Sequence, residues 1–477
     1  MRGNAGLWLP WGLGAYFLAQ TIVRLWVGPG VQLDEAELLV MARDFRWGYG
    51  PQEPLYNWLQ AGVFSLLGVN VAALVVTKNA CLWLFYMLVF LGLRRFCDAR
   101  RAAVAVLGLL FVPTIVWEAQ RTLSHSVALM VMSAAFLWAV CGLLRRDSWR
   151  GWLLLGLTAG LGGLSKTNFW ILPPALALAL WSLPPAPGRT GQGPGALRGG
   201  LLAALVAVAI LIGPLLWDMA HPDLALMSVG KLYRDAAPAL GGRYLGGVFE
   251  VIEAAVLTFV LLLPVVLAAR WFARRGAPEV PPPEAVWIRR LLLRSLFVGL
   301  GLLAVAMTIA GAARVSPRWL LPLAVPGAVG LALWALEAGA ARAGRVITSA
   351  AVVVALTVLI GIAVVFGTRP SRLSDDYTAL HDRVRELAAE NGAQVTGAIR
   401  DLGALLAVGP DLPVAAEPPL GTAYPPGRPL LRVIPGQGDD TPPAQGADLR
   451  GREILPVPNR IDPDRAQDFA VEIWDLP

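Results

Sequence analysis

Residues 6–40, GLWLPWGLGAYFLAQTIVRLWVGPGVQLDEAELLV, join a long apolar run to a group of acids. The run over 6–27 has the length that an α-helix needs to cross a bilayer, about 20 residues. It is too long for a cleavable signal peptide and lacks a small-residue cleavage site, so we expect a retained first span. Asp34, Glu35 and Glu37 follow within a few residues. The stretch therefore predicts a membrane protein with an acidic loop after its first span.

The composition of the whole chain agrees with a polytopic membrane protein. Hydrophobic residues make up 56% of the 477 positions and charged residues only 15%, whereas soluble domains are about a quarter charged. The net charge is +7, but the arginines stand in short clusters between apolar runs. A nucleic-acid partner is not expected, because no basic stripe is present. The three cysteines, Cys81, Cys97 and Cys141, do not suggest a disulfide framework.

Apolar runs of spanning length predict a mainly α-helical protein with about eleven transmembrane helices, in a range of about 9 to 13. Two of the runs are short and could be half-helices or tilted pieces. The predicted spans are 7–27, 69–92, 101–118, 124–144, 151–164, 168–182, 199–217, 248–270, 290–311, 317–336 and 344–366.

The charges between the spans predict the orientation. With the N-terminus in the cytoplasm, the inner loops hold clearly more Arg and Lys than the outer loops, as the positive-inside rule requires. An odd number of crossings then leaves the C-terminus outside. We therefore expect a multi-pass protein of the inner (plasma) membrane with a periplasmic or extracellular C-terminus.

Two domains are predicted: a transmembrane domain over 1–368 and a small extracytoplasmic α/β domain over 369–477. In the second, SDDYTALHDRVRELAAENG predicts an amphipathic helix with Ser374 as N-cap and Gly392 as C-cap. AQVTGAI predicts a strand after it.

The predicted first outer loop, 28–68, is long, acidic and rich in aromatic residues. Its spacing predicts two short amphipathic helices lying along the membrane surface. A plain alternative is that a loop between helices needs soluble residues, with Asp34 as a helix N-cap and Glu37 completing a capping box.

A series of motifs favours a functional interpretation of these acids. In this order the series resembles the bacterial GT-C glycosyltransferases of the protein-mannosyltransferase-like group, which includes the lipid A aminoarabinose transferase. The resemblance covers roughly residues 7–340. The motifs are LDEAE (33–37), GYGPQEPLYNWLQ (48–60), RTLSHSVALM (121–130), GLGGLSKTNFWILP (160–173) and VSPRWLLPLAVP (315–326).

The resemblance implies transfer of a sugar from a polyprenyl-phosphate donor to an extracytoplasmic lipid, glycan or protein, with inversion. It places the catalytic carboxylate at Asp34, as general base, with Glu35 orienting substrate or a metal. A divalent ion held by these two acids is left open, and no other cofactor is expected. Cations near the outer face would bind the lipid phosphate. The candidates for substrate binding are Lys166, Arg318, Arg243, Tyr244, Arg121, His125, Glu53 and Tyr56.

Plainer interpretations of these residues stay open. Lys166 could extend to the membrane interface, Arg318 could be an interfacial anchor, and His125 could be a buried, hydrogen-bonded histidine. Glu53 departs from the family, which usually has a Pro-Pro pair where this chain has Glu-Pro. A carboxylate there would repel a phosphate unless it points toward the acceptor, a metal or an arginine.

Two rival functions remain. A transporter or flippase of a lipid-linked sugar would show inverted repeats and broken helices, and no matched halves are found. An inactive scaffold is the third possibility. Retained transfer by an Asp34→Asn protein would support either rival.

Overall fold

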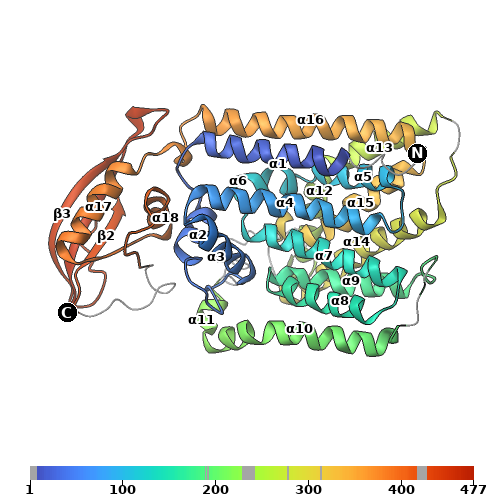
Figure 1. Cartoon of the computed structure of the whole chain (residues 1–477), viewed down its shortest axis with the longest axis horizontal. Coiled ribbons are helices and arrows are strands. Elements are labelled where there is room, and N and C mark those ends of the chain that lie inside the picture. The colour runs from blue at the N-terminus through green and yellow to red at the C-terminus, as the bar shows by residue number, and fades with distance from the viewer. Residues whose placement is uncertain are drawn as a thin grey trace. The chain divides into compact units, whose positions relative to one another are not determined.

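The computed structural model describes residues 8–188, 190, 193–227, 242–276, 279–311, 314–415 and 427–477 (Figure 1). The chain is mainly helical, as predicted. Its helices are α1 (Trp8–Val27), α2 (Leu33–Met41), α3 (Leu55–Leu67), α4 (Val71–Leu93), α5 (Ala99–Leu107), α6 (Ala119–Arg121), α7 (His125–Arg145), α8 (Trp149–Gly163), α9 (Leu172–Trp181), α10 (Gly195–Ala220), α11 (Pro222–Ala225), α12 (Gly242–Phe259), α13 (Leu262–Arg274), α14 (Pro283–Ala310), α15 (Leu321–Leu336), α16 (Ala340–Gly367), α17 (Thr378–Asn391) and α18 (Ile399–Val408).

Every predicted spanning segment is helical. Among the described residues, 6 helices are long and apolar enough to cross a membrane, or up to 8 if each of two bent pairs is one span. The bend is 81° between Ala99–Phe111, which begins with α5, and Thr114–Arg121, which ends with α6. It is 58° between α12 and α13. Pro113 lies at the first break and Pro264 in the first turn of α13, and proline interrupts helical hydrogen bonding. A count of eleven crossings stays a prediction.

The chain forms two compact units. The first comprises Met1–Phe17, Pro51–Leu55 and Ala80–Val358. Within it α15 is almost wholly buried and contacts α5, α7, α13 and α14. Figure 1 shows α8 and α10 side by side, and small residues of α8 face α10 along this contact. Such small residues let helix backbones approach closely, which is the usual packing of helices in membranes.

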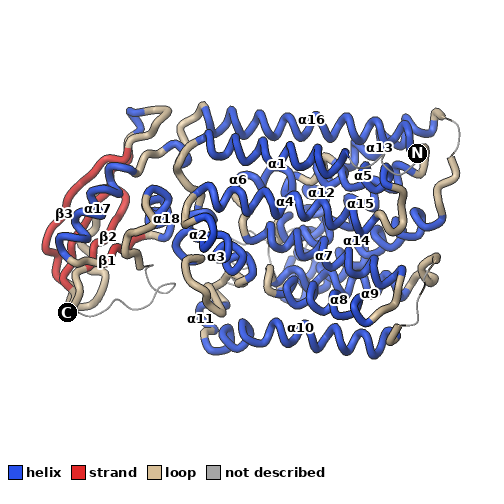
Figure 2. Tube along the Cα trace, in the orientation of Figure 1, coloured by secondary structure: helices blue, strands red, loops and turns tan. Residues whose placement is uncertain are grey.

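The second unit comprises Leu18–Gly50, Tyr56–Asn79 and Leu359–Pro477. Its C-terminal part contains the predicted α/β elements, with a four-stranded sheet in the order β1-β2-β4-β3. β1 and β2 are parallel and joined through α18, the other neighbours are antiparallel, and α17 packs against the sheet (Figure 2). The strands are β1 (Gln394–Gly397), β2 (Leu430–Pro435), β3 (Asp448–Val457) and β4 (Gln467–Asp475).

The predicted C-cap of α17 is confirmed, and the predicted N-cap is wrong. Gly392 has the left-handed conformation that ends many helices, with φ 59°. Ser374 instead ends a short 3-10 turn, and α17 begins four residues later at Thr378. The Asp376 carboxylate accepts the Thr378 N–H at 3.0 Å, and so supplies the cap that was assigned to Ser374.

The predicted first outer loop contains two helices, α2 and α3, where two were expected. Most of α2 is buried, including Ala36, Leu38 and Leu39. This packing fixes α2 within the second unit. The placement of both helices along a membrane surface stays a prediction.

Candidate active site

A buried carboxylate anchors the first turn of α2. Glu35 is only 2% exposed. Arg24 of α1 donates from Nη2 to Oε2 at 2.7 Å and from Nε to Oε1 at 3.3 Å. Lys78 of α4 places its Nζ 3.5 Å from Oε1, and the Gln32 amide donates to Oε2 at 3.1 Å. Glu35 therefore ties α2 to two other helices of the second unit.

The surroundings of Glu35 keep it ionised. Burial alone would raise the pKa of its carboxyl group, but the charges of Arg24 and Lys78 and the hydrogen bonds from Arg24 and Gln32 outweigh burial and lower the pKa to about 2. Both oxygens are therefore occupied by protein donors. This donor set does not fit a metal ligand. Among the described residues, no group of three or more His, Cys, Asp or Glu could hold a metal ion.

Asp34 precedes Glu35 on the same turn and is half-buried. Successive side chains on a helix diverge by about 100°, so Asp34 cannot share the direction of Glu35. The carboxylate of Asp34 acts electrostatically on Lys78. The predicted capping roles of Asp34 and Glu37 are wrong, because the capping box pairs Gln32 with Glu35.

The C-terminal part of the second unit supports α2 from another side. Gly403 of α18 packs so closely on Ala36 that a Cβ there would overlap the Ala36 Cα and Cβ. The Gly30 N–H donates to the Leu373 carbonyl at 3.1 Å in the loop before α2. The backbone that carries Asp34 is thus held by α1, α4 and α18 together.

In the first unit, a tight turn brings several motifs together. This turn, Ser165–Asn168, follows α8 and is called the SKTN turn here. Lys166 donates from Nζ to the Ser126 hydroxyl at 3.0 Å. Thr167 donates from its hydroxyl to Oε1 of Glu53 at 3.1 Å.

The SKTN turn also reaches the last motif of the series. Asn168 donates from Nδ2 to the backbone carbonyls of Trp319 at 3.1 Å and Arg318 at 3.4 Å. The Arg318 side chain pairs with Glu118, with 2.8 Å between Nε and Oε2. Four of the five predicted motifs therefore contribute residues to one cluster in the first unit.

The comparisons with known proteins show what the chain is similar to. Residues 51–217 match the family model described as dolichyl-phosphate-mannose-protein mannosyltransferase. Two relatives from Rhizobium johnstonii, the lipopolysaccharide core galacturonosyltransferases RgtA and RgtB, are 34% identical over 315 and 313 residues. These matches cover 65% of this chain, and they span 61% and 62% of the length of the two relatives.

Solved structures share the fold. ArnT from Cupriavidus metallidurans bound to undecaprenyl phosphate has a TM-score of 0.56 at 14% identity, over 96% of this chain and 97% of that one. The arabinofuranosyltransferase AftD from Mycobacteria has a TM-score of 0.52 at 17% identity, over 97% of this chain and 40% of that one. The chain therefore has the GT-C fold of these structures. The resemblance predicted from the motif series is thereby confirmed.

Glu53 is a feature in which this GT-C protein departs from the expected motif. Burial raises the pKa of its carboxyl group, the negative charge of Asp218 raises it further, and the hydrogen bond from Thr167 opposes both. The predicted conflict between this carboxyl group and a donor phosphate stays a prediction.

The remaining predicted residues of the GT-C site lie in several places. His125, at the start of α7, is buried next to Ser126 and within the electrostatic influence of Lys166. Tyr56 is buried on α3. Arg121 is exposed at the end of α6. Arg243 and Tyr244 belong to α12 by their backbone, and their side chains lie outside the described residues.

The motif series missed the two cations that hold Glu35 in this GT-C chain. Arg24 and Lys78 both lie inside predicted spans, at 7–27 and 69–92. A charge within a spanning helix is unfavourable by about 2.5–3.5 kcal/mol and is usually paired. The position of Arg24 and Lys78 inside predicted spans therefore indicates an acidic partner for each of them.

Proposed function

We propose that this GT-C protein is an inverting glycosyltransferase with a polyprenyl-phosphate sugar as donor and an extracytoplasmic glycan as acceptor. The acceptor hydroxyl oxygen attacks C1 of the donor sugar while the bond from C1 to the phosphate oxygen breaks. Polyprenyl phosphate leaves with the electron pair of that bond. Asp34 takes the proton of the acceptor hydroxyl as general base.

The observation that carries this proposal is the set of contacts that holds the backbone around Asp34 in place. Arg24 and Lys78 hold the neighbouring Glu35, and α18 packs on the same turn. Catalytic groups need such support from buried partners to keep a productive orientation. The capping role belongs to Gln32 and Glu35, so local helix chemistry does not account for Asp34.

We assign donor binding to the cluster in the first unit. Because the phosphate is a good leaving group, its departure needs stabilising cations more than it needs a general acid. Lys166 and Arg318 are the cations of this cluster, and Glu53 and Asn168 order the SKTN turn that carries Lys166. His125 stands beside Ser126, the partner of Lys166, and helps to shape this site.

The relatives support a choice of sugar and acceptor. Both are named as lipopolysaccharide core galacturonosyltransferases. We therefore propose galacturonic acid as the transferred sugar and a lipopolysaccharide core oligosaccharide as the acceptor. A donor that carries a hexose and one that carries a pentose would use the same base and the same phosphate-binding cations.

The test is a transfer assay with purified protein. Polyprenyl-phosphate carriers of radiolabelled galacturonic acid, mannose and arabinose are each incubated with protein and lipopolysaccharide. We expect label transfer from the galacturonic acid carrier, and a fall of about 10²–10⁴-fold in the Asp34→Asn protein, the usual contribution of a general base. Glu37→Gln, an acid on the same helix, is the matched control and should retain activity. Undiminished transfer by a well-expressed Asp34→Asn protein would contradict the proposal.

The two bent helix pairs favour a second candidate, a transporter or flippase of a lipid-linked sugar, because broken helices are typical of transporters. Reconstituted vesicles separate the two functions. A flippase would move the intact carrier across the bilayer without releasing polyprenyl phosphate, in wild-type and Asp34→Asn protein alike.

A further inference from the structure

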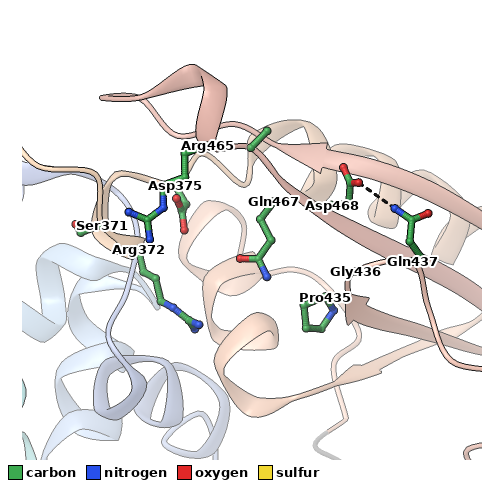
Figure 3. Close-up of a pocket in the computed structure, with 10 residues that line it drawn as sticks. Ser371, Arg372, Asp375, Pro435, Gly436, Gln437, Arg465, Gln467 and Asp468 are labelled. Atoms are coloured by element: carbon green, nitrogen blue, oxygen red, sulfur yellow. Dashed lines mark hydrogen bonds between the residues drawn. The ribbon is translucent and has the colours of Figure 1, made fainter.

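A polar pocket of about 640 Å³ lies within the C-terminal part of the second unit. Three segments form it: the 3-10 turn after α16, the end of β2 and the start of β4. Its volume is typical of small-molecule sites, which span about 300–1,000 Å³. Figure 3 shows Arg372, Asp375, Gln437, Arg465, Gln467 and Asp468 among its lining residues.

The two acids of this pocket are bound by amide groups. Asp375 accepts a hydrogen bond from Nδ2 of Asn459 at 2.7 Å. Asp468 accepts one from Nε2 of Gln437 at 3.0 Å, drawn as the dashed line in Figure 3. Neither carboxylate is within ion-pair distance of an arginine among the described residues.

The two arginines keep most of their donors available. Arg465 donates from Nη1 to the Pro370 carbonyl at 3.3 Å. The Arg372 guanidinium makes no hydrogen bond or ion pair with any described residue, and its side chain is exposed. Gln467 lies between these arginines and Pro435 in Figure 3. The pocket therefore presents two guanidinium groups and a carboxamide to a ligand, beside the two amide-bound carboxylates of Asp375 and Asp468.

This chemistry selects an anionic saccharide. Guanidinium groups bind phosphate and carboxylate through paired hydrogen bonds. An amide such as Gln467 can donate to and accept from sugar hydroxyls. The described lining holds no aromatic residue and no large aliphatic side chain, so a lipid tail does not fit.

The pocket is joined to the helix that carries Asp34. Ser371, Arg372 and Asp375 form one side of it. The carbonyl of Leu373, the residue after Arg372, accepts the N–H of Gly30 in the loop before α2. A Cβ at Gly28 or Gly30 would overlap the backbone of Leu373 or Arg372, so the two segments are in direct contact. A ligand held by Arg372 would thus be fixed to the same backbone as the proposed base.

We propose that this C-terminal pocket binds a phosphate or carboxylate group of the acceptor saccharide. The inference rests on the proposed function, because it takes the acceptor to be an anionic glycan. Arg372 and Arg465 grip the anion, and Gln467 contacts a neighbouring hydroxyl. The pocket selects acceptors and takes no part in bond breaking.

Binding to the purified full-length protein in detergent tests this proposal, with glucose 6-phosphate and digalacturonic acid as anionic probes and maltose as the neutral one. Calorimetry should show the anionic probes binding at least about tenfold more tightly than maltose. The Arg372→Gln/Arg465→Gln protein should lose that preference. Arg385→Gln removes an exposed arginine of α17 that pairs with Asp382, and should bind like wild type.

Two results would overturn the proposal: unchanged affinity in the double variant, or no preference of the wild-type protein for anionic probes. The Asp34→Asn protein separates this test from that of the proposed function, since it should bind the probes normally while failing to transfer. In the transfer assay, the double variant should raise the KM for acceptor at least about tenfold and leave kcat unchanged.

Discussion

At the residue scale, the ion pairs of Glu35 with Arg24 and Lys78 stabilise the candidate site. Replacing it with glutamine would leave Arg24 and Lys78 buried without their counter-charge. Breaking a buried ion pair from one side usually destabilises a protein by about 3–5 kcal/mol. We expect Glu35→Gln to lower the thermal unfolding midpoint of the purified protein clearly. Glu37→Gln, the half-buried acid two positions on, is the control and should shift the midpoint little.

The pH dependence of this loss follows from the low pKa of Glu35. Its pKa is about 2 in the folded protein, against an ordinary value of 4.5. A carboxyl group whose folded pKa is lowered adds stability above its unfolded pKa, and that stability disappears as the pH falls through the folded value. The gap between wild type and Glu35→Gln should therefore be full at pH 7 and narrow between pH 4.5 and 2. An equal gap at pH 7 and near pH 2 would show that lost packing, and not charge, is the cause.

At the element scale, the contact between α18 and α2 can be tested by a single substitution. Any side chain at Gly403 would collide with Ala36 and push α2 away. Overpacking of this kind destabilises by about 1–3 kcal/mol. Because Asp34 lies two residues before Ala36, Gly403→Val should lower kcat at least about tenfold while the protein stays folded at 25 °C.

A second glycine in the C-terminal part gives the control for Gly403. Gly451 has open space around the position of a Cβ, so Gly451→Ala should leave transfer and unfolding unchanged. Wild-type kcat in a folded Gly403→Val protein would mean that α18 does not position the base.

The sequence predicted elements well where the signal is local. Apolar length predicted helices that the structure contains, and Gly392 predicted the end of α17, because both signals depend on neighbouring residues only. The start of α17 was misplaced because Ser374 and Asp376 are both good capping residues and pattern alone cannot choose between them. The roles of Arg24 and Lys78 were missed because their shared partner, Glu35, is distant in sequence and depends on which helices pack together.

At the scale of the whole molecule, the order of motifs predicted the resemblance to GT-C proteins, and the contacts group the parts of the chain differently from the composition. The sequence suggested a boundary at residue 368, where composition changes. The structure instead groups Leu359–Pro477 with Leu18–Gly50 and Tyr56–Asn79. Composition cannot reveal this grouping, because it arises from glycine contacts such as Gly30 with Arg372 and Gly403 with Ala36. The C-terminal segment therefore helps to hold α2, the helix that carries Asp34, in place.

The proposed reaction requires Asp34 and the C-terminal segment to lie outside the cytoplasm, so it depends on the orientation of the chain in the membrane. The predicted odd number of crossings, with the N-terminus inside, would place the loop of Asp34 and the C-terminal segment outside the cytoplasm. Alkaline phosphatase, which is active only outside the cytoplasm, should be active when fused after Pro477 and inactive when fused after Arg275, at the end of α13. These two fusion points decide the orientation, since they lie on opposite predicted sides of the membrane. The reverse pattern would put Asp34 in the cytoplasm, where an extracytoplasmic acceptor could not reach it, and the proposed function would have to be abandoned.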